Sequence, residues 1–170
     1  MKTRMRWTFW TRLACKVALI AAITVALPAE ETFADIWQDV NRIFELNAKL
    51  HPGMTIDALN ELLGPPADEY CMSGTTPELT RYMWLHGEMG IEVYELEGTA
   101  YRVNITLPCD NSAGALRALD ALTRQGREKY GAVPLFDYAT GQHYWIQDGI
   151  RFAFSKYNQT TVFSSCMRVR

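Results

Sequence analysis

GIEVYELEGTAYRVNITL, residues 90–107, is the stretch that decides the fold of this chain. Residues 90–96 and 101–107 alternate apolar and polar side chains, and the turn dipeptide Glu97-Gly98 separates them. One face of the second run carries Tyr101, Val103, Ile105 and Leu107, and the other carries Arg102, Asn104 and Thr106. A period of two is typical of strands that bury one face. The stretch therefore predicts two antiparallel strands in a sheet that is covered on one side only.

Helical patterns precede this stretch. Residues 35–50 place apolar side chains at helical spacing, and His51-Pro52-Gly53 ends the pattern. Thr55 predicts the N-cap of a second, short helix over 56–63, which Gly64 stops. Two further strands are predicted near 69–72 and 81–86. The first part of the domain is therefore expected to contain two helices followed by strands.

A second helix-then-strands unit follows residue 110. Its helix is predicted from an N-cap at Ser112 to about Lys129. The apolar side chains expected on the buried side of this helix are Leu116, Leu119 and Leu122. Asp148-Gly149 is a strong signal for a two-residue hairpin. The strands predicted for this unit are 135–138, 142–147, 150–156 and 161–169.

The two units can be laid over each other. Tyr82-Met83-Trp84 aligns with His143-Tyr144-Trp145, and Gly90-Ile91 aligns with Gly149-Ile150. The chain is therefore expected to be an α+β domain in which helices pack on one face of an antiparallel sheet. We expect a tandem arrangement of two similar units. Unit one is predicted to cover 35–110 and unit two 111–170.

A short motif in the first unit resembles a known family signature. The motif consists of Gly53-Met54-Thr55 followed by Leu59, Leu62, Leu63-Gly64 and Pro66. It resembles the G-M-T…L-L-G-x-P signature of the SmpA/OmlA (BamE-like) group of small outer-membrane assembly lipoproteins. The same signature occurs twice in the tandem-repeat β-lactamase-inhibitor proteins (BLIP-like). The resemblance covers about residues 46–107 and implies a shared helix-helix-sheet unit, which bears on fold more than on function.

The first 34 residues predict a secretory signal peptide. Basic residues open this segment, an apolar run covers 13–27, and the small-residue site Thr32-Phe33-Ala34 follows. The apolar run is about 15 residues long, shorter than the roughly 20 that a membrane-spanning helix needs. Cleavage is expected after Ala34, with Ala29 as the alternative, and an uncleaved membrane anchor is the competing interpretation. Residues 35–170 would then be periplasmic or secreted.

Cysteine content and charge narrow the classes of function. The cysteines after residue 34 are Cys71, Cys109 and Cys166. An oxidising compartment favours one disulfide, for which we expect Cys71–Cys109, with Cys109–Cys166 as the alternative. No C-x-x-C spacing occurs and the histidines are scattered, so neither a metal site nor a cofactor is expected. Residues 35–170 carry 12 basic and 17 acidic residues, a net charge of about −5, which argues against nucleic acid as a partner.

Aromatic residues on the predicted strands favour a binding function. None of the linear motifs of hydrolases, zinc proteases or nucleotide-binding enzymes is present. We expect Tyr82, Tyr94 and Tyr144 on the open face of the sheet, because exposed tyrosines are frequent in protein contacts. Glu88, Glu92 and Glu95 are expected at the rim of that face, where they would attract a basic partner.

The sequence thus predicts an exported, non-enzymatic protein-binding module. The sharper hypothesis is an inhibitor or immunity-type protein that presents its sheet face to another protein. Two alternatives stay open: a structural factor in cell-envelope assembly, and a small periplasmic hydrolase. No nucleic acid and no stable membrane insertion after cleavage are expected.

Overall fold

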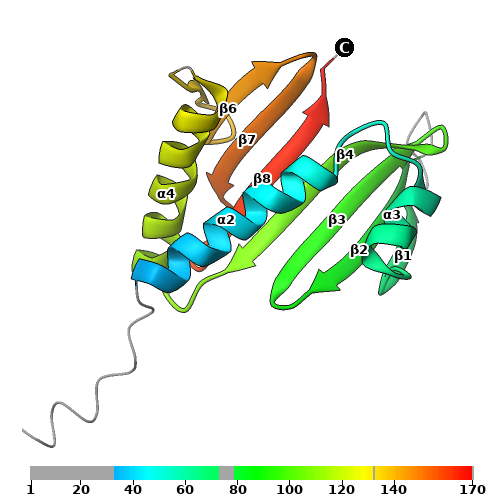
Figure 1. The fold of residues 1–170 in the computed structure, drawn as a ribbon, viewed down its shortest axis with the longest axis horizontal. Helices are drawn as coiled ribbons and strands as arrows, with labels where there is room; N and C mark the ends of the chain where they lie inside the picture. The colour runs from blue at the N-terminus through cyan, green and yellow to red at the C-terminus, as the bar shows by residue number, and fades with distance from the viewer. Residues whose placement is uncertain (1–32, 73–78, 132, 170) are drawn as a thin grey trace, which may run out of the picture. The chain divides into compact units, whose positions relative to one another are not determined.

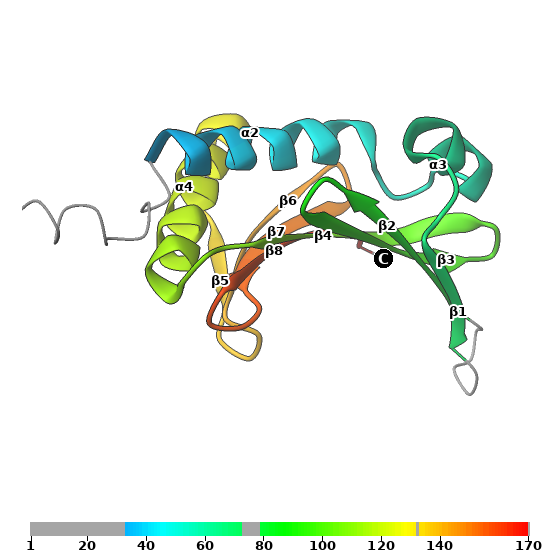
Figure 2. The same ribbon diagram turned by 90° about the horizontal axis from the view of Figure 1, so that it is seen from below.

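An eight-stranded antiparallel sheet with helices on one face forms the body of the protein (Figures 1 and 2). The computed structural model describes residues 33–72, 79–131 and 133–169. The part of the chain from Phe33 onward forms one compact unit. The expected α+β class is confirmed. The predicted signal peptide lies outside the described residues, except for Phe33 and Ala34, which begin the first described helix.

All the predicted helices and strands are present, with small shifts at their ends. In chain order they are α2 (Phe33–Lys49), α3 (Ile56–Leu63), β1 (Asp68–Met72), β2 (Leu79–His86), β3 (Met89–Leu96), β4 (Thr99–Pro108), α4 (Ser112–Tyr130), β5 (Leu135–Asp137), β6 (Gln142–Gln147), β7 (Ile150–Lys156) and β8 (Thr161–Arg168). The strand order across the sheet is β1-β2-β3-β4-β8-β7-β6-β5. β4 and β8 therefore meet at the centre, and each half runs outward from them in the reverse of its chain order.

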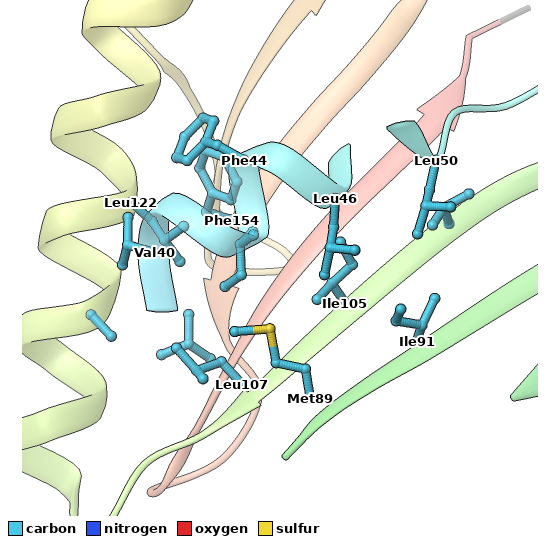
Figure 3. Close-up of a cluster of buried hydrophobic side chains, with 14 of the residues drawn as sticks. Val40, Phe44, Leu46, Leu50, Met89, Ile91, Ile105, Leu107, Leu122 and Phe154 are labelled. Carbon is cyan, nitrogen blue, oxygen red and sulfur yellow. The ribbon is translucent and has the colours of Figure 1, made fainter. Parts of the chain in front are cut away.

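One hydrophobic core lies between the helices and the sheet. α2 lies over the middle of the sheet, α3 over its β1 end, and α4 over the β6–β8 half (Figures 1 and 2). Phe44 of α2 packs against Phe154 of β7, with ring centroids 5.4 Å apart, and Leu46 points toward Ile105 in the same core (Figure 3). α2 contacts α4 and contributes its apolar side chains to the shared core. Its apolar stripe therefore covers the central strands.

The predicted hairpin turns are confirmed in detail. Glu97 and Gly98 have φ angles of 53° and 83°, and Asp148 and Gly149 have φ angles of 52° and 73°. Type I′ turns require positive φ at both central residues, because their twist matches the twist of the paired strands. Thr55 caps α3 as predicted, since its hydroxyl accepts a hydrogen bond of 3.3 Å from the amide of Ala58.

Two details predicted for α4 are corrected, its N-cap and the burial of Leu116. Its N-cap is Asn111 rather than Ser112, because the Asn111 side chain accepts a 2.8 Å hydrogen bond from the amide of Gly114. Of the three leucines expected on its buried side, Leu122 is buried and Leu119 packs against the core, but Leu116 is 56% exposed. Small residues make up most of this side. The buried residues of this side are Gly114, Ala115, Ala118, Ala121, Leu122, Thr123 and Gly126. Small side chains suit this helix because it packs closely against both α2 and the sheet.

The strand registers correct one part of the internal alignment. Trp84 in β2 pairs with Ile91 in β3, and Trp145 in β6 pairs with Phe152 in β7. If the two tryptophans correspond, Ile91 corresponds to Phe152 and not to Ile150. The misalignment arose because the glycine of each hairpin was used as the marker. In the first hairpin Gly90 lies inside β3, whereas Gly149 lies in a turn.

Candidate binding groove

The sheet face opposite the helices is the candidate functional surface. Both ends of the sheet bend away from the helix layer, so this face is concave (Figure 2). A cavity of about 490 Å³ lies on it, and its lining includes Arg81, Glu92, Tyr94, Arg102 and Phe163. We call this cavity the groove. Its volume falls within the range that is usual for ligand-binding clefts.

A continuous row of paired residues crosses this face. Its members, in order from β1 to β6, are Tyr70, Arg81, Tyr94, Arg102, Met167, Arg151 and Ile146. We call this set the arginine row. Tyr94 and Arg102 alternate with the buried Val93 and Val103, which places the row on the side away from the helices. Arginine thus alternates with aromatic or apolar side chains from strand to strand.

The positively charged side chains of the groove and of the arginine row differ in whether a carboxylate lies beside them. Arg81 lies 4.0 Å from a carboxylate oxygen of Asp68 and 3.8 Å from one of Glu92. Arg151, at the other side of the row, forms a 3.2 Å ion pair with Asp137. Among the described residues no carboxylate pairs with Arg102 or with Lys156, which also lines the groove.

Arg102 is held in a defined orientation at the centre of the sheet. Its Nε donates hydrogen bonds of 2.8 Å to Asn104 Oδ1 and 3.0 Å to Ser165 Oγ. Its guanidinium carbon lies 5.9 Å from the ring centroid of Tyr94 and 5.7 Å from that of Phe163. Two acceptors at Nε and two flanking rings restrict the side chain before any ligand arrives.

The surroundings of Tyr94 and Asp137 shift the pKa values of these two groups in opposite directions. Burial raises the pKa of Tyr94, and the nearby carboxylate of Glu92 raises it further. The phenol therefore stays neutral and donates a hydrogen bond of 3.5 Å to Glu92 Oε2. Hydrogen bonds from Thr140 and Arg151 lower the pKa of Asp137. Asp137 is thus ionised at neutral pH and keeps Arg151 compensated.

The predicted tyrosines do not all share one face. Tyr94 and Tyr144 lie on the open face, since each precedes or follows a buried residue of the core face. Tyr82 instead pairs with Val93 and packs against the core beneath the helices, so its placement on the open face was wrong. Alternation alone contained this signal, because Tyr82 is two residues from the buried Trp84 and must share its side.

The three predicted acids do not gather at a rim. Glu92 lies inside the groove, where it faces Arg81 and Asn104. Glu88 lies between β2 and β3, and Glu95 accepts a hydrogen bond from the amide of Gly98 in the next turn. The three acids were expected together because they are close in sequence, but the turn, the strand and its end place them apart.

The predicted disulfide is absent. Cys71 lies on β1 and Cys166 on β8, and both carry free thiols. Cys166 pairs with Val103, and Cys109, the residue after β4, lies six residues from Val103, about 20 Å away at about 3.3 Å per residue. Cys71 is separated from β4 by β2 and β3, about 14 Å at about 4.8 Å per strand. Neither predicted pair meets the Cα separation of a disulfide, about 4.4–6.8 Å.

The described lining of the groove combines charged, polar and aromatic groups. Its described lining residues supply guanidinium, ammonium and carboxylate groups, hydroxyls, amides and aromatic rings, and include no histidine or cysteine. Within residues 33–72, 79–131 and 133–169 no group of three metal-ligating side chains comes together. In the same part of the chain no helix is long and apolar enough to span a membrane.

Comparison with known proteins yields no relative of this chain. No protein-family model, no curated protein and no solved structure matches it.

Proposed function

We propose that this protein is a non-enzymatic protein-binding module that receives its partner on the concave face of the sheet. The observation that carries the proposal is the arginine row, which alternates cations with aromatic and apolar side chains over seven neighbouring strands. Arginine and tyrosine are enriched at the energetic centres of protein interfaces. The two exposed ends of the row, Tyr70 and Ile146, add apolar contact area on either side.

The fold supports the proposal that two similar units were joined in tandem. Each half has four strands in the same sequence, and the halves meet at β4 and β8 in opposite orders. Trp84 and Trp145 lie on the second strand of their halves and are both buried. This arrangement is the one expected from the resemblance to the tandem-repeat β-lactamase-inhibitor proteins.

Export to the periplasm or the cell exterior is part of the same proposal. The basic start and the apolar run of residues 1–34 support it. Amino-terminal sequencing of the protein from an envelope fraction tests this point. A mature terminus near Asp35 is expected, and a retained Met1 would contradict cleavage.

Site-specific photocrosslinking tests the binding face. A benzophenone amino acid would be placed at Tyr144 or Met83 on the open face, and at Leu116, which is exposed on α4, as the control. We expect a discrete crosslinked protein in the cell of origin from the open-face positions only. A soluble protein as the product favours the inhibitor or immunity hypothesis, whereas outer-membrane assembly machinery favours a structural role. Equal capture from Leu116, or none from the open face, would contradict the proposal.

A further inference from the structure

The terminal nitrogens of Arg102 indicate which chemical group of a partner would bind in the groove. Its Nε is occupied by Asn104 and Ser165, and no described group forms an ion pair or hydrogen bond with its terminal nitrogens. Arginine presents these two nitrogens as a planar fork that matches the two oxygens of a carboxylate. The side chain is therefore ordered before binding and retains its main donors for a ligand.

The surroundings of Arg102 favour an anion over a cation. Arg81 and Arg102 project from the open face into the groove together with a single carboxylate, that of Glu92. Glu92 is already engaged with Arg81 at 3.8 Å, so it does not neutralise Arg102. The groove is thus locally positive on a chain whose formal net charge is −2. Such a local field attracts an acidic partner and opposes a basic one.

The length of the arginine row favours a polypeptide over a small molecule. The row crosses the sheet from Tyr70 to Ile146, a span of about 29 Å at about 4.8 Å between strands. An extended segment of about nine residues covers this distance at about 3.3 Å per residue. Exposed side chains at both ends, 57% for Tyr70 and 54% for Ile146, lie where such a segment would continue.

Given the protein-binding role proposed above, we infer that the groove receives an acidic, extended segment of the partner protein. One carboxylate of the segment pairs with the terminal nitrogens of Arg102, between the rings of Tyr94 and Phe163. Arg81 and Arg151 stay with their own carboxylates and lie on either side of this contact.

The inference is tested with a capped peptide of about ten glutamates, titrated into the purified chain and followed by amide NMR shifts. We expect saturable shifts at residues of β3, β4 and β8 around Arg102, and weakening of the binding as salt is raised. Peptides of glutamine and of lysine of the same length are the charge controls. Glutarate, which carries the same carboxylates without a chain, distinguishes a polypeptide site from a small-molecule site.

Variants assign the binding to Arg102. Arg102→Gln should weaken the glutamate peptide at least about tenfold, since a charge-assisted hydrogen-bonded pair is lost. Arg102→Lys should restore only part of the affinity, because the charge returns without the planar fork. Arg127→Gln, on the exposed side of α4, makes the same charge change and should have no effect. The dispersion of the NMR spectrum shows whether each variant is folded.

The outcomes separate this inference from the proposed function. Lysine peptide binding as tightly as glutamate peptide, or an unchanged affinity in folded Arg102→Gln, overturns the acidic segment. Glutarate binding as tightly as the peptide also overturns it, in favour of a small carboxylate ligand. If open-face crosslinking captures a partner equally well in the Arg102→Gln variant, the proposed protein binding stands and the inference of an acidic segment is wrong. If the glutamate peptide binds but no partner is captured, the proposed function fails instead.

Discussion

Gly126 of α4 lies directly against Trp145 of β6: a Cβ at position 126 would be 2.6 Å from Cη2 of the indole. The same Cβ would be 3.1 Å from the ring of Phe154. Both rings are buried, and they contact each other with centroids 5.6 Å apart, so neither can move away easily. The glycine therefore allows α4 to approach the sheet over the β6–β7 hairpin.

This contact predicts that Gly126→Ala destabilises the protein. Alanine in a helix interior is ordinarily favoured over glycine by about 1 kcal/mol. Here overpacking against Trp145, which costs about 1–3 kcal/mol, should exceed that gain. Chemical unfolding of the single variant and of the double variant with Trp145→Phe measures the coupling. With the smaller ring, the alanine should become neutral or stabilising; an equal loss in both backgrounds would mean that the indole is not the cause.

Trp84 and Trp145 should contribute similarly to stability. Their exposed fractions are 2% and 4%, and the Nε1 of Trp84 donates a 2.9 Å hydrogen bond to the carbonyl of Gly64. Either tryptophan changed to alanine should lower the free energy of unfolding by about 3–5 kcal/mol. Ile146→Ala, on the exposed side of the same strand as Trp145, is the control and should cost well under about 1 kcal/mol. Similar midpoints for all three variants would be inconsistent with two buried tryptophans.

The two candidates for the N-cap of α4 can be distinguished directly. Asn111→Ala removes the acceptor for the amide of Gly114 and should cost about 1 kcal/mol of stability. Ser112→Ala, one residue later, leaves that hydrogen bond intact and should be nearly neutral. Thermal unfolding of both variants is sufficient. A larger loss from Ser112→Ala would restore the cap predicted from the sequence.

Cysteine reactivity should follow exposure. Cys71 is exposed on the edge strand β1, whereas Cys166 is fully buried in β8. Iodoacetamide should therefore label Cys71 in the native protein and Cys166 only after unfolding in urea. Peptide mapping by mass spectrometry reads both sites in one experiment. A disulfide-linked peptide containing Cys71 or Cys166, isolated without reduction, would contradict the structure.

Cys166 should make the protein sensitive to alkali. Burial raises the pKa of its thiol from 9.0 to about 12. The folded state holds this thiol neutral, so the associated stability is fully present below pH 9 and is lost as the pH rises from 9 toward 12. A shift of this size corresponds to a loss on the order of 4 kcal/mol.

Cys166→Ala should therefore flatten the decline of stability above pH 9. Burial also raises the pKa of Tyr130, which is present in both proteins and leaves a common residual decline. Urea unfolding at several pH values between about 8 and 11 gives the two slopes. Parallel slopes would show that the thiol does not titrate with unfolding.

Local pattern was enough to predict most of the secondary structure. The alternation of residues 101–107 predicted both faces of β4, and Arg102, Asn104 and Thr106 do lie together on the open face. The turns at Glu97-Gly98 and Asp148-Gly149 were predictable because positive φ restricts the residues that can occupy them. Tyr82 was misplaced although its spacing from Trp84 already contained the answer.

The groove could not be predicted in the same way. Tyr94, Arg102 and Arg151 belong to one row only because β4 pairs with β8, which follows it by more than 50 positions. The order of the two halves decides that pairing, and no local pattern encodes it. The three cysteines show the same limit, since their separation depends on which strands are neighbours and in what register.

The sequence by itself therefore determined the elements, the turns and the two-sided character of the strands. These depend on φ/ψ preferences and on side-chain periodicity, which act over a few neighbouring residues. Only the tertiary structure decided that Arg102 lies between Tyr94 and Phe163 at the centre of a concave face. That arrangement depends on long-range strand pairing and on the burial of one sheet face by α2 and α4, because the free energy of burial is set by the whole core rather than by any one segment.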